Sequence, residues 1–271
     1  MKPASRGSSL AKLTADVGRL QEDVIRLYAW REVRQRLVQV FEGNPLLRDD
    51  WTPLHTFIFS GYTAQACLSV RRLMDRGKKG REQRRQPVSL GNVMKQLCDC
   101  PCIITRCDYV DRCRGAITKA NCPDALSQEE RGALDAAVER HIVEQANREY
   151  DAYSGPGRCR LSRYIIARHY CEARRKCDAV LKDADKRLAH CDRKGPGVPT
   201  WGELDDAIDA VGELFCYIDR LVTGSTSVPD ELAGTWQGGR RDWEELLRIP
   251  WVSAASGQSV QAKPSPGSHG T

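Results

Sequence analysis

The sequence predicts an all-α protein, organised as an antiparallel bundle of four long helices and several short ones. Apolar residues recur at steps of three and four through most of the chain, the spacing that places them on one face of a helix. No segment alternates apolar and polar residues as a half-buried strand does, and no strand–helix–strand pattern occurs. We therefore expect a single helical domain over residues 1–252, with long connections between its helices.

The first two helices are predicted over residues 10–41 and 53–76. The sequence Gly-Asn-Pro at 43–45 ends the first, and Gly77 follows the basic end of the second, where glycine commonly caps a helix. The second helix therefore carries three charged residues in its last turns: Arg71, Arg72 and Asp75.

Short and long helices are expected in the second half of the chain. A short one fits residues 88–97, and Ser127 with Glu130 forms a capping box that opens a helix to about residue 150. A third long helix is predicted from residue 161 to about 191, before Gly-Pro-Gly at 195–197. Thr200 with Glu203 forms a second capping box, opening a helix that runs to Gly224. Two tryptophans, Trp243 and Trp251, are expected to pack back on the bundle.

Positive charge is concentrated in one short segment. Residues 71–85 hold six Arg and two Lys against one Asp and one Glu, whereas the formal net charge of the whole chain is +6. Such a block suits a polyanion such as RNA or DNA, with a solvated helix end and loop as the alternative. Three arginines of the loop are candidate phosphate contacts: Arg81, Arg84 and Arg85.

Hydropathy argues against a membrane protein. The mean hydropathy is −0.52, and no run of eighteen apolar residues occurs. The first ten residues carry no apolar stretch typical of a signal peptide, so we expect a cytoplasmic location. Residues 253–271 are small, polar and rich in Pro and Gly, and are expected to be a disordered tail.

The twelve cysteines are expected to be reduced thiols. Half of them fall in a cysteine-rich connection over residues 98–122, with the pattern C-x-C-x-C-x4-C-x5-C-x8-C: Cys98, Cys100, Cys102, Cys107, Cys113 and Cys122. These are enough thiolates for a zinc site, but no pair has the C-x2-C spacing that brings two sulfurs onto one ion. We therefore expect no metal and, in the absence of a P-loop or H-E-x-x-H motif, no cofactor.

The segment over residues 183–192 carries the strongest candidate chemistry. On a helix, residues three or four apart share a face, so Arg187 and His190 lie together, beside Lys186. A histidine can move protons near neutral pH, and a guanidinium binds phosphate oxygens and the charge that develops on them. The alternative is that these basic residues compensate the dipole at a helix C-terminus.

Several motifs resemble those of the HEPN superfamily, in particular its abortive-infection (AbiU-type) subgroup. The sequence D-K-R-L-A-H-C-D at 185–192 is similar to the D-K-R-x-A-H-S-D signature of that subgroup. S-V-R-R-L-M-D-R at 69–76 is similar to its L-R-R-L-x-D-R helix end. Three further matches follow in the family's order, so that the resemblance spans residues 51–251: V-S-L at 88–90, T-R-C-D-Y-V at 105–110, and D-W with I-P-W at 242–251.

This resemblance implies a helical bundle, often a homodimer, that cleaves RNA without metal through attack of a 2′-hydroxyl. It implies a phage-defence or toxin-like protein, with an antitoxin protein as a candidate partner. His190 would be the general acid or base, Arg187 and Lys186 would bind phosphate, and Asp185 would orient the motif. The end of the second helix would complete the cleft through Arg71, Arg72 and Asp75.

The chain departs from this family at one position. Where the subgroup's nucleases carry an arginine ahead of the histidine, the sequence has Ala184. Arg187, Lys186, or the arginines of the second helix would then have to supply the missing positive charge. The alternative function is a non-catalytic helical bundle that binds nucleic acid or a protein partner.

Overall fold

The computed structural model describes residues 6–43, 53–77, 88–117, 128–188, 197–225, 228–229 and 231–232. Over these ranges the protein is all-α, as the sequence predicts, and the only extended pairing is one isolated bridge between Thr105 and Arg160. The helices are α1 (Arg6–Gly43), α3 (Pro53–Met74), α4 (Leu90–Asp99), α5 (Arg106–Ile117), α6 (Gln128–Ser154), α7 (Arg163–Lys176), α8 (Asp178–Asp183), the π-helix η2 (Ala184–Leu188) and α9 (Trp201–Thr223).

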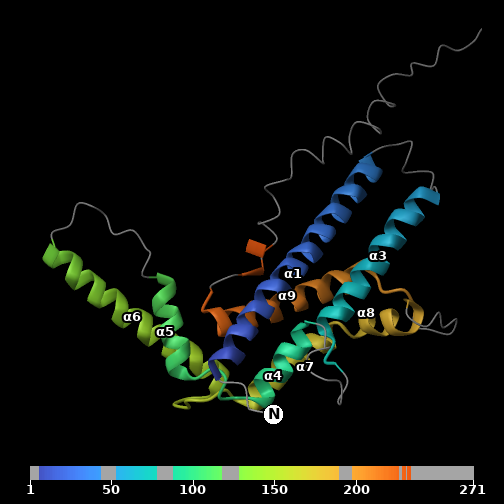
Figure 1. The fold of residues 1–271 in the computed structure, drawn as a ribbon. Coiled ribbons are helices and arrows are strands. Elements are labelled where there is room, and N and C mark those ends of the chain that lie inside the picture. The colour runs from blue at the N-terminus through green and yellow to red at the C-terminus, as the bar shows by residue number, and fades with distance from the viewer. Residues whose placement is uncertain are drawn as a thin grey trace, which may run out of the picture.

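Helix α9 lies at the centre of the packing, with α1, α3 and α7 against it (Figure 1). The Thr200–Glu203 capping box opens it, and Gly224, with φ of 78°, ends it in the left-handed conformation. The sequence predicts both ends of this helix. The helical spacing of apolar residues in α9 places a row of fully buried side chains in the core, among them Ile208, Phe215 and Ile218.

The prediction of one continuous helix over residues 161–191 is wrong, because the helix is interrupted at Cys177. Helix α7 ends at Lys176, α8 follows for six residues, and η2 continues the segment as a π-helix. The Cys177 thiol is fully buried and donates to the carbonyl of Ala207 on α9 at 3.6 Å. The interruption therefore coincides with burial of this side chain against α9. No glycine or proline in the sequence marks its position.

The cysteine-rich connection contains helical structure that was not predicted from its sequence. Helix α4 runs to Asp99, and α5 begins at Arg106 after a short turn. At that start the Thr105 amide donates to Asp108 Oδ2 at 2.8 Å, while Thr105 Oγ1 accepts from the Asp108 amide at 3.4 Å. This reciprocal cap stabilises the first turn of α5.

Helices α5 and α6 extend away from the other helices (Figure 1). The side chains of residues 134–141 on α6 are all exposed, whereas Tyr150 and Tyr153 near its C-terminus are buried. Glu149 joins this end of α6 to its neighbours. It accepts from Tyr109 of α5 at 2.8 Å and from Arg220 Nε of α9 at 3.1 Å.

Glu149 is expected to make stability depend on pH. Burial raises its pKa, but hydrogen bonds from Arg220, Tyr109 and Gln145 outweigh that effect and leave the pKa below its usual value of 4.5. A lowered folded-state pKa stabilises the protein above pH 4.5, and that contribution is lost as pH falls through the folded value. Urea unfolding between about pH 6 and pH 3 should therefore show a smaller loss of stability in Glu149→Gln than in the wild type. Equal losses would contradict this assignment.

Several expectations concern residues outside the described ranges. These are the side chains of the first capping box, Ser127 and Glu130, the packing of Trp243 and Trp251, and the tail at 253–271. Within the described ranges, none of the helices combines the length and apolar character needed to cross a membrane.

Candidate functional site

The end of α3 meets η2, which lies 114 residues further along the chain. The Arg71 guanidinium donates from Nε to Asp185 Oδ1 and forms an ion pair with it. Both side chains remain about half exposed, at 45% and 52%. The expected proximity of these two motifs is therefore confirmed for Arg71 and Asp185.

Helix α3 ends in a junction with α4 that fixes its last residues. Ser89 Oγ donates to the Asp75 carbonyl at 2.6 Å and also caps α4 by accepting from the Asn92 amide at 3.2 Å. The Asp75 carboxylate accepts from the amide of Gly77 at 3.2 Å, and Gly77 has φ of 61°. In the described part of the chain the Asp75 carboxylate closes this turn and forms no ion pair with Lys186 or with the arginines of its own helix. The expected bridge to Arg187 concerns a side chain outside the described part.

Arg72 forms an ion pair with a different helix from that of Arg71. Its Nη2 lies 2.7 Å from Asp23 Oδ1 on α1, whereas Arg71 pairs with Asp185 on η2. Consecutive residues on a helix point about 100° apart, so Arg71 and Arg72 reach different partners. The expectation that both arginines face the same motif is therefore wrong for Arg72.

Tyr170 and Arg174, which the sequence does not single out, lie with Arg76 at the end of α3. Tyr170 of α7 donates to the Met74 carbonyl at 2.7 Å, and Arg174 Nη1 donates to Tyr170 Oη at 3.4 Å. Arg76 lies over the Tyr170 ring, 4.3 Å from its centroid. The only hint in the sequence is the four-residue spacing of Tyr170 and Arg174 on a helix whose last turn is basic.

We call this cluster the α3–η2 junction; its charged members are Arg71, Arg76, Arg174, Asp185 and Lys186. The hydrogen bond to Tyr170 raises the pKa of Arg174, and the nearby Asp185 adds to that rise. Asp185 and Lys186 are exposed. The junction therefore presents more positive than negative charge to solvent, which suits a phosphate-bearing ligand.

The π-helix sets which residues of the motif face outward. A π-turn holds more residues than an α-turn and so changes the register of the side chains. Asp183 and Ala184 are fully buried, while Asp185 and Lys186 face solvent. The position where the resembling nucleases carry arginine thus points into the core in this chain, and an arginine there would not reach the junction.

Some predicted site residues lie outside the described part of the chain. These are His190 and the loop arginines Arg81, Arg84 and Arg85. The backbone of Arg187 belongs to η2, but its side chain is also outside the described part.

The cysteines whose side chains are described are free thiols, and Cys122 is not among them. Their burial varies: Cys113 is buried, whereas Cys100, Cys102 and Cys107 are exposed. No group of three or more His, Cys, Asp or Glu in the described ranges is arranged to hold a metal ion.

Comparison with protein-family models, curated proteins and solved structures finds no match to this chain. The resemblance to the HEPN superfamily consequently rests on the sequence motifs alone. Of these, the segments over 69–76 and 185–192 contribute the two residues that form the Arg71–Asp185 ion pair.

Proposed function

We propose that this chain is a HEPN-type phage-defence or toxin-like protein that acts on RNA at the α3–η2 junction. The observation that carries the proposal is the ion pair between Arg71 and Asp185. It joins the two segments with the clearest resemblance to the family's motifs, although they are far apart in the sequence. Chance similarity of two short motifs gives no reason for them to meet in space.

The chemistry follows from the residue types at this site. The 2′-hydroxyl oxygen attacks the adjacent phosphorus, the bond from phosphorus to the 5′-oxygen breaks, and a 2′,3′-cyclic phosphate forms. His190 takes the 2′-hydroxyl proton or protonates the departing 5′-oxygen. Arg187 and Lys186 stabilise the charge on the phosphate oxygens, and Arg71 holds Asp185 and positions the motif.

Charge supports a polyanion such as RNA as the ligand. The junction holds four cations, Arg71, Arg76, Arg174 and Lys186, against the carboxylate of Asp185, and the carboxylates of Asp75 and Asp178 lie beside it. The basic loop at 78–85 continues directly from the end of α3 and adds Arg81, Arg84 and Arg85. A homodimer and a protein antitoxin are further partners that the family resemblance suggests.

A non-catalytic role is the second candidate, and one observation favours it. The buried Ala184 leaves the junction without an arginine at the position that active members of the resembling family use. A protein of this kind would bind RNA at the same surface without cutting it.

Incubation of the purified protein with total RNA in EDTA tests the proposal. We expect fragments that carry 2′,3′-cyclic phosphate and 5′-hydroxyl ends, because attack by the 2′-hydroxyl needs no metal. Binding without any cleavage would favour the non-catalytic role. Cleavage that EDTA abolishes, or neither binding nor cleavage, would contradict both candidates at this site.

Neutralising Asp185 should strengthen RNA binding. Asp185→Asn removes the carboxylate that pairs with Arg71 and leaves its guanidinium free to contact one further phosphate. The plot of log affinity against log salt for single-stranded RNA should then steepen by about 0.7. Folding stability should change little, because exposed ion pairs contribute about 0–1 kcal/mol.

Glu172→Gln provides the matched control for this substitution. Glu172 pairs with Arg168 on α7 at 2.9 Å and has a similar exposure, 50%. In the described part of the chain Glu172 forms no ion pair with a member of the junction. An equal change in salt dependence for the two variants, or no change in Asp185→Asn, would show that Arg71 does not meet phosphate.

A further inference from the structure

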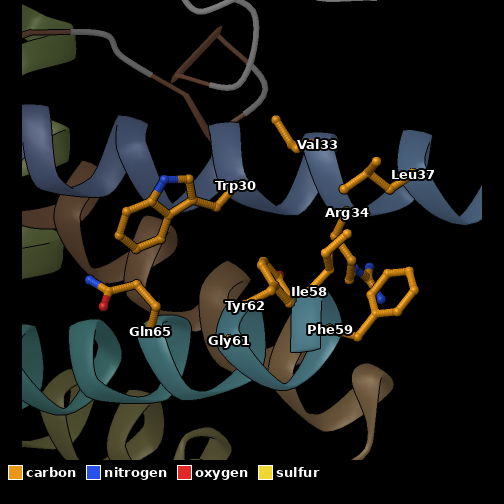
Figure 2. A pocket seen from close by; sticks show the side chains of 9 residues that line it. All are labelled: Trp30, Val33, Arg34, Leu37, Ile58, Phe59, Gly61, Tyr62 and Gln65. Atoms are coloured by element: carbon orange, nitrogen blue, oxygen red, sulfur yellow. The ribbon is translucent and has the colours of Figure 1, made fainter. Parts of the chain in front are cut away.

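A pocket of about 360 Å³ opens between α1 and α3 (Figure 2). Its volume lies within the roughly 300–1,000 Å³ of small-molecule sites. Aromatic and aliphatic side chains of both helices line it together with one arginine: Trp30, Val33, Arg34, Leu37, Ile58, Phe59, Gly61, Tyr62 and Gln65.

A second hollow of about 250 Å³ adjoins the first and shares Trp30 and Gln65 with it. Its other lining residues are mainly charged or polar: Asp23, Arg26, Leu68, Ser69 and Arg72. We call the two hollows together the α1–α3 groove. The groove is apolar and aromatic at one end and charged at the other.

The charged end can accept an anion. Arg26 and Arg72 provide two guanidinium groups, 55% and 52% exposed, against the single carboxylate of Asp23. Ser69 adds a hydroxyl to the same lining. Because guanidinium groups bind phosphate oxygens in pairs, this end suits a phosphate.

The apolar end contains polar atoms that have no partner. Arg34 is only 6% exposed, and its Nη2 pairs with Asp205 at 2.6 Å. Its Nε and the hydroxyl of Tyr62 are closed to solvent and have no hydrogen-bond partner in the described part of the chain. An aliphatic ligand would leave both groups unpaired, whereas a heteroaromatic ring offers acceptors at its edge.

We propose that the α1–α3 groove is a nucleotide-binding subsite. The base lies against Trp30 and Tyr62 with its polar edge toward Arg34, and the phosphate is bound by Arg72 and Arg26. Aromatic side chains bind unstacked bases in this way while basic residues follow the backbone. Arg71, the residue before Arg72, belongs to the α3–η2 junction, so a strand can extend from the groove to the junction across the exposed face of α3. In this respect the inference rests on the proposed function.

Gly61 offers a way to block the groove without disturbing the core. It lines the pocket on α3, and a Cβ at this position would meet no atom within 4 Å (Figure 2). Gly61→Leu should therefore obstruct the pocket while improving helix propensity. Gly18→Leu on α1 is the matched control, since Gly18 also has open space and is exposed outside the groove.

The test compares binding of AMP and ribose 5-phosphate by calorimetry. AMP should bind at least tenfold more tightly, the order of one stacked base, and Gly61→Leu should remove that difference while Gly18→Leu keeps it. Arg72→Gln should weaken both ligands. Equal affinities for the two ligands, or an unchanged preference for AMP in Gly61→Leu, would overturn the subsite.

A second arm uses a single-stranded RNA oligonucleotide and distinguishes this inference from the proposed function. If the strand uses the groove, AMP competes with the RNA and Gly61→Leu weakens RNA binding. Selective AMP binding without any RNA binding would sustain the subsite for a free nucleotide and contradict the proposed function. RNA binding that neither AMP nor Gly61→Leu affects would sustain the proposed function and overturn the subsite.

Discussion

His190→Ala should lower metal-independent RNA cleavage by about 10²–10⁴-fold, the usual contribution of a general acid or base. The imidazole is the one group of the 185–192 motif that exchanges protons near neutral pH. Its loss should leave RNA binding within a few-fold of the wild type, because the phosphate contacts come from arginine and lysine. Rates would be measured in EDTA on a labelled single-stranded RNA.

His141→Ala is the control for this experiment. His141 is exposed on α6, outside the α3–η2 junction, so its removal should change neither cleavage nor stability. Undiminished cleavage in His190→Ala would mean that another group moves the proton or that a contaminating nuclease is responsible. Either result would remove His190 from the mechanism.

Gly91→Ala should destabilise the protein and disturb the site at the same time. A Cβ on Gly91 would lie 2.4 Å from the carbonyl oxygen of Asp75 and 2.7 Å from its carbonyl carbon, closer than real contacts allow. Since these are backbone atoms, α3 and α4 would have to separate. Such overpacking costs about 1–3 kcal/mol of folding free energy, measurable by urea unfolding.

Gly18→Ala separates this steric effect from helix propensity. Gly18 lies inside α1 with nothing near its Cβ position, so alanine there should stabilise the protein by about 0.5–1 kcal/mol. Gly91→Ala should also weaken RNA binding, because it displaces the last turn of α3, which carries Arg71. Stability equal to or above that of the wild type would contradict the close approach of α3 and α4.

Local signals in the sequence account for much of the fold. The capping box of Thr200 and the left-handed Gly224 bound α9 because both act through hydrogen bonds within a few residues of the helix end. The break at Cys177 has no such signal, since it accompanies burial of the thiol against Ala207 on another helix. Tertiary packing overrides the helical period there.

The site was predictable only in part, and for a physical reason. Arg71 and Asp185 were paired through a family resemblance, because helical periodicity does not say which helix ends meet. The roles of Tyr170 and Arg174 depend on contact with the end of α3, almost one hundred residues earlier. The α1–α3 groove likewise arises from two helices whose separate patterns show only buried faces.

Photo-cross-linking of 4-thiouridine-containing single-stranded RNA, followed by peptide mass spectrometry, tests the location of the RNA site most directly. The α3–η2 junction predicts cross-links in peptides that cover the last turn of α3 and residues 184–188. Asp185→Asn should increase their yield, and Glu172→Gln should not. Cross-links confined to α5 and α6, with none at the end of α3 or in η2, would contradict the account.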